Sequence, residues 1–267
     1  MTSDRPVVLT IAGFDPSGGA GVIADVRTIL QFGCRPAAAI TSLTFQNVHA
    51  FFGAIHESAE SLRAQIMPII EETRPAAVKV GMLPTARLIL EVADLIRNNR
   101  LPAPVFDPVL KSSSGGELIE PEAIPVLIRE LLPLARLLTP NIPEAEVLTG
   151  MRIEHQDDMR QAAVKLSEIG AQAVLIKGGH LAGKSDGGDQ KSARRSANDL
   201  LADDGDVTIF TAEWIDAPPI RGSGCMLSSA IAACLARGVT MKEAVSLAKE
   251  YVGREIREQL NHVMTQM

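Results

Sequence analysis

The sequence has few aromatic residues and no basic stripe. Aromatic side chains make up 3% of its 267 residues and hydrophobic residues 46%, so the core must consist mainly of Ala, Val, Ile and Leu. Such a composition is common in α/β proteins whose parallel strands are buried on both faces. The net charge is −6 and the basic residues cluster only in the short stretch Lys191–Arg195, which argues against nucleic acid as a partner.

Cysteines and long apolar segments are equally scarce. Cys34, Cys225 and Cys234 are odd in number and lack the spacing of metal ligands, a pattern that fits a reducing cytoplasm. No apolar run approaches the roughly 18–20 residues needed to span a bilayer, so we expect no membrane partner. The polar residues Met1–Pro6 lead directly into an expected strand, which predicts the absence of a signal peptide.

The chain does contain a regular alternation of short aliphatic runs and longer helical patterns. This alternation implies βαβ crossovers, so we predict an α/β fold: a single domain over residues 1–267 with a mainly parallel central sheet between two helical layers. The expected strands are Pro6–Ala12, Pro36–Thr41, Ala77–Val80, Pro104–Asp107, Leu137–Thr139 and Ala173–Ile176. The expected helices are Ala20–Phe32, Ser58–Glu72, Arg87–Asn98, Pro121–Leu132, Ile142–Thr149, Gln156–Ile169, Met226–Arg237 and Met241–Arg257. The polar segment Leu181–Asp206 is expected to form an exposed loop that leads into a hairpin at Asn198–Phe210.

A glycine-rich segment, Ala12–Gly21, follows the first expected strand and precedes a helix. Glycines there let backbone amides approach a ligand, and a helix start is electropositive. The segment lacks both the dinucleotide pattern Gly-x-Gly-x-x-Gly and the Gly-Lys-Ser/Thr of a P-loop. A tight turn without a ligand is the alternative. Asp25, just inside the helix, either hydrogen-bonds a ligand or favours the helix start.

A second glycine-rich segment precedes the helix expected at Met226–Arg237. Its amides can converge on phosphate oxygens and form an anion hole. The four amides belong to Gly222, Ser223, Gly224 and Cys225. We expect a lowered pKa for Cys225, because a helix start favours the thiolate. An ordinary cap with a buried cysteine is the alternative.

Several polar side chains directly follow expected strands. Asp107 ends its strand at the place where α/β sheets carry ligand-binding residues. Asn141 and Glu144, three residues apart, suit either a site for magnesium and its waters or a helix capping pair. Lys177 can bring an ammonium to a phosphate, although a lone lysine at a strand end is usually only solvated. Parallel strands gather their carboxyl ends at one edge, so these groups and the Cys225 turn form one constellation suited to phosphoryl transfer.

With these motifs in this order, the sequence resembles the hydroxymethylpyrimidine/phosphomethylpyrimidine kinases of thiamin biosynthesis, within the ribokinase-like superfamily. The resemblance extends from about residue 7 to about residue 257 and rests on the combination of motifs. The motifs that carry it are Ala12–Gly21 with Asp25, Gln46-Asn47, Val80–Met82, Asp107–Val109, Thr139–Ala145, Lys177–His180 and Gly222–Cys225.

The resemblance implies a cytoplasmic, usually dimeric enzyme that uses ATP and Mg²⁺ to phosphorylate 4-amino-5-hydroxymethyl-2-methylpyrimidine and then its monophosphate. It implies that Gln46 and Asp25 make the polar contacts of the pyrimidine. The residues implied to surround that ring are Gly13, Asp25, Gln46, Met82 and Val109. Cys225 stands where sugar kinases of the superfamily carry a catalytic aspartate, and is implied to act on the substrate hydroxyl.

The resemblance also assigns the phosphate end of the site. Lys177 is implied to contact the ATP phosphates. Asp107 and Glu144 are implied to organise Mg²⁺, and Asn141 belongs with both the nucleotide and the waters of the metal ion.

The sequence departs from the family pattern at several positions. Ser223 replaces the usual threonine and keeps its hydroxyl, whereas Arg221 replaces the usual histidine and adds a fixed charge beside the turn. Lys111 lies two residues before Ser113, the position where many members carry a lysine. Phe45 replaces a small residue and is expected to narrow the substrate pocket.

Two other functions are compatible with these residues. One is a pyridoxal/pyridoxine kinase, because some cysteine-bearing members of the superfamily phosphorylate vitamin B6. The other is a catalytically weak ligand-binding homologue. The intact set of Asn141, Glu144, Lys177 and Cys225 argues against the second of these.

Overall fold

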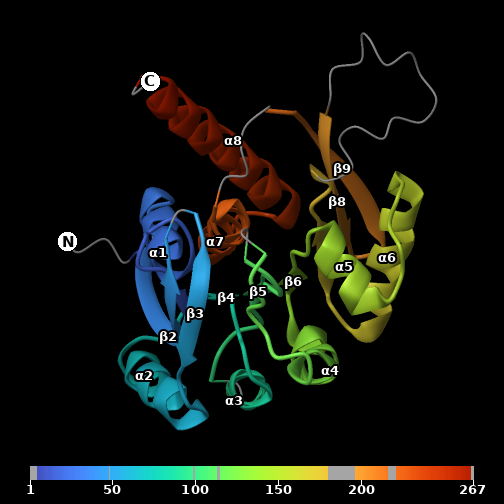
Figure 1. Cartoon of the computed structure of the whole chain (residues 1–267). Helices are drawn as coiled ribbons and strands as arrows, with labels where there is room; N and C mark the ends of the chain where they lie inside the picture. The colour runs from blue at the N-terminus through green and yellow to red at the C-terminus, as the bar shows by residue number, and fades with distance from the viewer. Residues whose placement is uncertain are drawn as a thin grey trace, which may run out of the picture.

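The computed structural model describes residues 5–47, 49–98, 100–112, 115–179, 196–215 and 221–265. Within these ranges, nine strands form one sheet in the order β3-β2-β1-β4-β5-β6-β7-β8-β9 (Figure 1). The strands are β1 (Val7–Phe14), β2 (Arg35–Gln46), β3 (Phe51–His56), β4 (Ala77–Val80), β5 (Val105–Phe106), β6 (Leu137–Leu138), β7 (Ala173–Ile176), β8 (Ser196–Asp203) and β9 (Asp206–Glu213). The helices are α1 (Gly21–Gln31), α2 (Ala59–Glu72), α3 (Ala86–Arg97), α4 (Ala123–Val126), α5 (Ile142–Thr149), α6 (Gln156–Ile169), α7 (Ser223–Ala236) and α8 (Met241–Thr265).

The centre of the sheet is parallel and both edges are antiparallel. β1 pairs in parallel with β2 and β4, and parallel pairing continues through β5, β6 and β7. β3 runs antiparallel to β2, and the β8–β9 hairpin adds two antiparallel strands beyond β7. Asp204 and Gly205 join that hairpin with φ angles of 52° and 81°, as in a two-residue type I′ turn. The predicted mainly parallel α/β sheet is confirmed.

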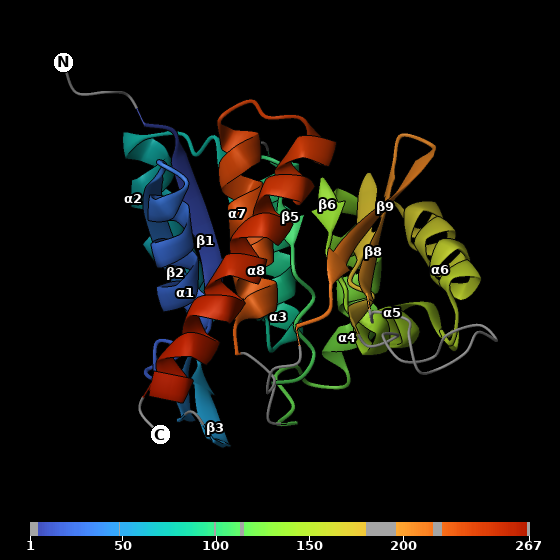
Figure 2. The ribbon, with the colours of Figure 1, turned by 90° about the horizontal axis from the view of Figure 1, so that it is seen from above.

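Neighbouring strand residues point into opposite cores, because side chains alternate along a strand. On β1, Val8 belongs to the core beneath α1, α7 and α8, whereas Leu9 belongs to the core beneath α2, α3 and α6. Both side chains are fully buried. Figures 1 and 2 show the sheet between these two helical layers, which confirms the three-layer arrangement.

Several elements differ from the prediction in their bounds or their form. β2 continues to Gln46 and pairs with β3, a strand that sequence reasoning missed. The buried and exposed residues of β3 do not alternate cleanly, and Gly53 in the middle of β3 has a φ of 145°, so the period-two signal of this strand is weak.

The helix predicted at Pro121–Leu132 is α4 followed by a π-helical turn and a 3₁₀ turn. In a regular α-helix the ring of Pro133 would clash with the carbonyl of Arg129, four residues earlier, and Pro133 has no N–H to bond it, so the last predicted turn cannot be regular α-helix.

The carboxyl-terminal part of the chain brings α7 to the strand ends. α7 begins at Ser223, three residues before its predicted start, and α8 continues to Thr265. The predicted hairpin is confirmed, although β8 begins at Ser196. The remainder of the expected loop, residues 181–195, lies outside the described residues, as does Ser113. No helix in the described ranges is long and apolar enough to cross a membrane.

Candidate active site

The turn after β1 is held together by a buried carboxylate. Asp15, 1% exposed, accepts hydrogen bonds from the backbone N–H and hydroxyl of Ser17 and from the backbone N–H of Ala20. A Cβ on Gly21 would lie 2.2 Å from the carbonyl oxygen of Gly13, so only glycine fits where α1 begins. These contacts give the glycine-rich segment a fixed backbone shape, and Asp15 is a site residue that sequence reasoning missed.

The second glycine-rich turn packs directly on the first. Gly222 is the N-cap of α7 with a φ of 75°, and a Cβ there would lie 2.1 Å from the carbonyl oxygen of Gly19. The first intrahelical bond runs from the N–H of Met226 to the carbonyl oxygen of Gly222. Ser223, Gly224 and Cys225 therefore occupy the first turn of the helix, where backbone N–H groups have no intrahelical acceptor. Such N–H groups can donate hydrogen bonds to an anion. The anion hole stays a prediction, and this geometry supports it.

Cys225 lies in this first turn, and its ionisation differs from the expectation. Burial raises the pKa of the Cys225 thiol to about 11, although the nearby Lys79 ammonium lowers it. The backbone N–H of Gly21 donates a hydrogen bond to the sulfur, which also favours the thiolate. The predicted lowering of the pKa is therefore wrong, because removing the thiol from water outweighs the helix start. At neutral pH Cys225 is a thiol.

The polar groups at the carboxyl ends of β5, β6 and β7 converge as predicted from the topology. Lys177 Nζ lies 2.9 Å from Asp107 Oδ1, which also accepts a hydrogen bond from the Thr139 hydroxyl. A Cβ on Gly224 would lie 3.1 Å from Lys177 Nζ and 3.3 Å from Asp107 Oδ2. The ion pair therefore packs against the first turn of α7, and Gly224 leaves room for it.

The ammonium of Lys177 keeps its charge in this position. Burial alone would lower the pKa of Lys177, but Asp107 and Glu144 outweigh it and raise that pKa. The following residue, Gly178, is held by a hydrogen bond from its N–H to Asp199 Oδ1, and a Cβ on it would lie 1.9 Å from the carbonyl oxygen of Asn198. This close packing on β8 fixes the direction in which Lys177 leaves β7.

Asn141 and Glu144 form a helix capping box at the start of α5. The Asn141 side chain accepts from the N–H of Glu144, and the Glu144 carboxylate accepts from the N–H of Asn141. The same carboxylate accepts from the N–H of Leu110 and lies near Lys177 and Asp107. The helix capping pair, which was the alternative interpretation of Asn141 and Glu144, is therefore present. The capping box places the Glu144 carboxylate near Lys177 and Asp107.

Glu144 is 7% exposed, and its burial has an electrostatic consequence. Burial and the nearby Asp107 carboxylate together raise the pKa of Glu144 to about 7, although the Lys177 ammonium lowers it. An unfolded glutamate titrates near 4.3, so the folded protein binds the extra proton between about pH 4.3 and about pH 7. Stability should therefore fall as the pH rises through that window.

Glu144→Gln is expected to flatten this dependence and to be at least as stable as wild type at pH 7–8, because glutamine needs no ionisation. Turnover should fall by about 100-fold, as for the loss of a charged group that organises a phosphoryl-transfer site. Denaturant midpoints from pH 5 to 8 and steady-state kinetics at saturating Mg²⁺ check the two effects. Unchanged turnover would remove Glu144 from the metal site.

Whether Mg²⁺ fits this site can be judged from the carboxylates present. Among the described residues, no group of three His, Cys, Asp or Glu side chains gathers closely enough to hold a metal. Mg²⁺ commonly keeps several waters and binds through one or two carboxylates together with substrate phosphates. Asp107 and Glu144, which both lie near Lys177, therefore match the oxygen donors that this ion takes.

Asp25 has surroundings that the sequence did not indicate. Its carboxylate is fully buried and accepts hydrogen bonds from the hydroxyls of Thr10 and Ser229. Lys79 Nζ lies 2.8 Å from Asp25 Oδ2 and 3.0 Å from Oδ1, and the Lys79 side chain is fully buried as well. Burial would lower the pKa of Lys79, but Asp25 outweighs it and raises that pKa. Asp25 thus joins β1, β4 and α7; its contact with the pyrimidine stays a prediction.

The other residues assigned to the substrate lie at the ends of β1, β2, β4 and β5. A Cβ on Gly13 would lie 2.9 Å from the sulfur of Met82, so these two residues are in direct contact. Gln46 ends β2, where its amide donates to the Thr44 hydroxyl and accepts from Arg221. Val109 follows β5, and its N–H bonds to the carbonyl oxygen of Asp107. Their proposed contacts with substrate stay predictions.

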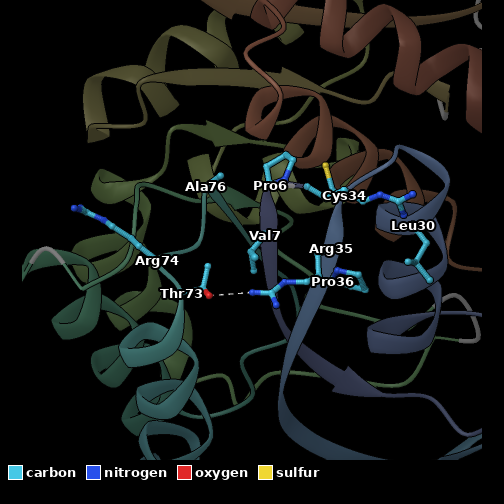
Figure 3. Close-up of a pocket in the computed structure, with 10 residues that line it drawn as sticks. Pro6, Val7, Leu30, Cys34, Arg35, Pro36, Thr73, Arg74 and Ala76 are labelled. Carbon is cyan, nitrogen blue, oxygen red and sulfur yellow. Dashed lines mark hydrogen bonds between the residues drawn. The ribbon is translucent and has the colours of Figure 1, made fainter. Parts of the chain in front are cut away.

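The structure also has a cavity at the other ends of the parallel strands, away from Asp107 and Lys177. It encloses about 710 Å³ at the amino-terminal ends of β1 and β2 and is lined by Arg5, Arg35 and Arg74 among others. Figure 3 shows Arg35 reaching Thr73 across it, whereas Arg74 points away. Arg35 also lies 3.8 Å from Glu72. This cavity is remote from the strand ends that carry the constellation.

The known proteins that this chain resembles in sequence and structure are kinases of small molecules. A model of the phosphomethylpyrimidine kinase family matches residues 15–266. The hydroxymethylpyrimidine/phosphomethylpyrimidine kinase of Streptomyces coelicolor is 39% identical over 247 residues, which cover 92% of this chain and 87% of that protein. The crystal structure of phosphomethylpyrimidine kinase from Clostridium difficile has a TM-score of 0.80 and 37% identity, covering 94% of this chain and 100% of that one.

A pyridoxal kinase is also structurally similar. The Staphylococcus aureus pyridoxal kinase in complex with AMP-PCP and pyridoxal has a TM-score of 0.80 and 29% identity, covering 94% of this chain and 88% of that one. The fold and these similarities define the class: an ATP-dependent vitamin kinase of the group that includes hydroxymethylpyrimidine kinases and pyridoxal kinases. Within that class, the chain belongs to the phosphomethylpyrimidine kinase family.

Proposed function

We propose that this protein transfers the γ-phosphoryl group of ATP to the hydroxymethyl group of 4-amino-5-hydroxymethyl-2-methylpyrimidine, and then phosphorylates the resulting monophosphate in thiamin biosynthesis. The observation that carries the proposal is the contact of the Asp107–Lys177 pair with Gly224 in the first turn of α7. This contact sets a cation, a carboxylate and free amides side by side. Phosphoryl transfer depends chiefly on such positioning and charge stabilisation.

The phosphate end of the site follows from these groups. Lys177 holds a γ-phosphate oxygen, and the amides of Ser223, Gly224 and Cys225 face the charge that develops on the transferring group. Asp107 and Glu144 would hold Mg²⁺ largely through water, with Asn141 fixing Glu144 through the capping box. When bound, the ion neutralises phosphate charge.

The acceptor end uses Cys225 and the pyrimidine pocket. An alcohol is a poor nucleophile, but the transition state for phosphoryl transfer is loose and does not require a strong base. With its raised pKa, Cys225 acts as a neutral thiol that orients the hydroxyl towards the phosphate. Gly13 and Met82 pack against the ring, with Val109 beside them, while Gln46 reads its polar edge.

A pyridoxal or pyridoxine kinase is the second candidate. Its support is the similarity to the S. aureus pyridoxal kinase, whose structure contains pyridoxal and a nucleotide analogue. The match of residues 15–266 to the phosphomethylpyrimidine kinase family model favours the pyrimidine.

A coupled assay of ADP formation with three acceptors tests the choice. We expect the largest kcat/KM for the pyrimidine alcohol, measurable turnover of its monophosphate, and the smallest kcat/KM for pyridoxal. Faster turnover of pyridoxal than of either pyrimidine would assign the protein to the second candidate. Omission of Mg²⁺, with EDTA present, should abolish activity with every acceptor.

A further inference from the structure

A chain of hydrogen bonds runs from the end of β1 through Gln46 to Arg221, two residues before α7. The Thr44 hydroxyl donates to the carbonyl oxygen of Phe14 at 2.8 Å. Gln46 Nε2 donates to the Thr44 Oγ1 at 2.8 Å. Arg221 donates to Gln46 Oε1 at the other end of the amide. Both ends of the Gln46 side chain are therefore engaged within the protein.

The direction of every bond in this chain is forced by chemistry. The Phe14 carbonyl can only accept, so the single proton of the Thr44 hydroxyl points at it. That hydroxyl can then only accept from Gln46, which must present its NH₂ group. At the far end, a guanidinium can only donate, so Gln46 must present its oxygen to Arg221. The orientation of an amide, which heavy-atom positions alone leave ambiguous, is thus set by its neighbours.

Arg221 is itself held firmly. Its side chain is 14% exposed; it lies 3.4 Å from Asp15 Oδ2 and donates to the carbonyl oxygen of Asn47. Asp15 in turn is fixed by the turn after β1. Arg221 therefore ties the strand end that carries Gln46 to both glycine-rich turns.

The anchored amide keeps one N–H and one oxygen lone pair for a ligand, because each end can make two hydrogen bonds. The amidine edge of an aminopyrimidine offers one acceptor, the ring nitrogen, and one donor, the exocyclic amino group, both bonded to the same ring carbon. Pyridoxal has its ring nitrogen and phenolic hydroxyl separated by a methyl-bearing carbon, and so lacks this edge.

We propose that Arg221 is the residue that sets substrate specificity, by locking the Gln46 amide in the orientation that selects a heterocycle with an amidine edge. Arg221 acts through Gln46 and is a positioning residue. The inference rests on the proposed use of Gln46 as the reader of the ring, and it adds the origin of its orientation.

The test compares Arg221→Met with Arg221→Lys. Methionine removes the donor to Gln46 Oε1 at similar length, whereas lysine retains a donor and the charge. For Arg221→Met we expect kcat/KM for the pyrimidine alcohol to fall about 10- to 100-fold, mainly through KM, as for the loss of a hydrogen bond to a charged group. Its kcat/KM for pyridoxal should change less than about threefold, and KM for ATP should not change. Arg221→Lys should restore most of the loss.

Thr44→Val supplies an independent variant at the other end of the amide. Thr44→Val should also lower the ratio of kcat/KM for the pyrimidine alcohol to kcat/KM for pyridoxal. In the Thr44→Val background, Arg221→Met should change this ratio less than it does in wild type. Gln46→Leu, which removes the reader itself, should lower pyrimidine kcat/KM at least as far as Arg221→Met. Circular dichroism and thermal melts of each variant exclude unfolding as the cause.

Equilibrium binding of the pyrimidine alcohol and of pyridoxal to nucleotide-free enzyme separates the inference from the proposed function. The proposed function fails if wild type does not phosphorylate the pyrimidine. The inference fails if Arg221→Met binds the two heterocycles with the same ratio of affinities as wild type, whether or not both affinities have fallen.

Discussion

Replacing Cys225 with alanine is expected to lower turnover by about 10²–10⁴-fold, the range for a side chain that handles the reacting proton or orients the reacting group. The fold and the affinity for ATP should remain close to wild type, because α7 has no side-chain cap and the backbone partner of the thiol is the N–H of Gly21 in another helix. Steady-state kinetics with the pyrimidine alcohol, together with nucleotide binding by calorimetry, give the two readouts. A variant with full turnover would make Cys225 a structural residue of the helix start.

The pH dependence distinguishes how the thiol acts. Because the pKa of Cys225 is raised to about 11, almost none of it ionises below pH 9. We therefore expect wild type and Cys225→Ala to show profiles of the same shape from pH 6 to 9, displaced by a constant factor. An alkaline rise present only in wild type would show that the thiolate is the working form. Cys234→Ala changes a buried cysteine of the same helix; it is the matched control and should keep the wild-type profile.

Loss of one member of the buried Asp25–Lys79 pair is expected to have the largest effect on stability. Lys79→Met leaves the Asp25 carboxylate without its counter-ion in a fully buried site, which should cost about 3–5 kcal/mol of unfolding free energy. Urea unfolding at pH 7 measures this loss. Lys242→Met, which breaks an exposed pair with Asp206, is the control and should cost less.

The double variant Asp25→Leu/Lys79→Met separates charge from packing. With both charges gone, only the hydroxyls of Thr10 and Ser229 lose a partner, so the double variant should be more stable than Lys79→Met. Equal or greater destabilisation in the double variant would show that shape rather than charge balance controls this part of the core.

The parallel sheet and its strand-end residues were predictable because local patterns and topology act together. A four-residue aliphatic run such as β7 is recognisable by itself, and a parallel sheet must then bring Asp107 and Lys177 to one edge. The capping box of Asn141 and Glu144 follows from their spacing and fixes both residues. These predictions required only short-range signals and one rule of chain geometry.

Contacts between distant segments left no comparable signal. Lys79 sits in the middle of a strand, where a lysine suggests exposure, and its partner Asp25 lies 54 residues earlier. The pKa of Cys225 depends on the partial burial of its thiol by segments distant in the chain, which the position of Cys225 at a helix start does not reveal. Arg221 was recognisable as a departure from the family pattern, but its contact with Gln46 required the fold.

The packing of Gly222 on Gly19 has a consequence for how the enzyme is made. Asp15 and Arg221 are 206 residues apart in the chain, and closing a flexible loop of that length costs about 5 kcal/mol of entropy. During synthesis, β1 and its turn leave the ribosome long before α7 exists, so the two walls of the site cannot meet until the last fifth of the chain emerges. Catalytic competence should therefore appear after most of the sheet has formed, and regain of activity on refolding should lag behind regain of secondary structure.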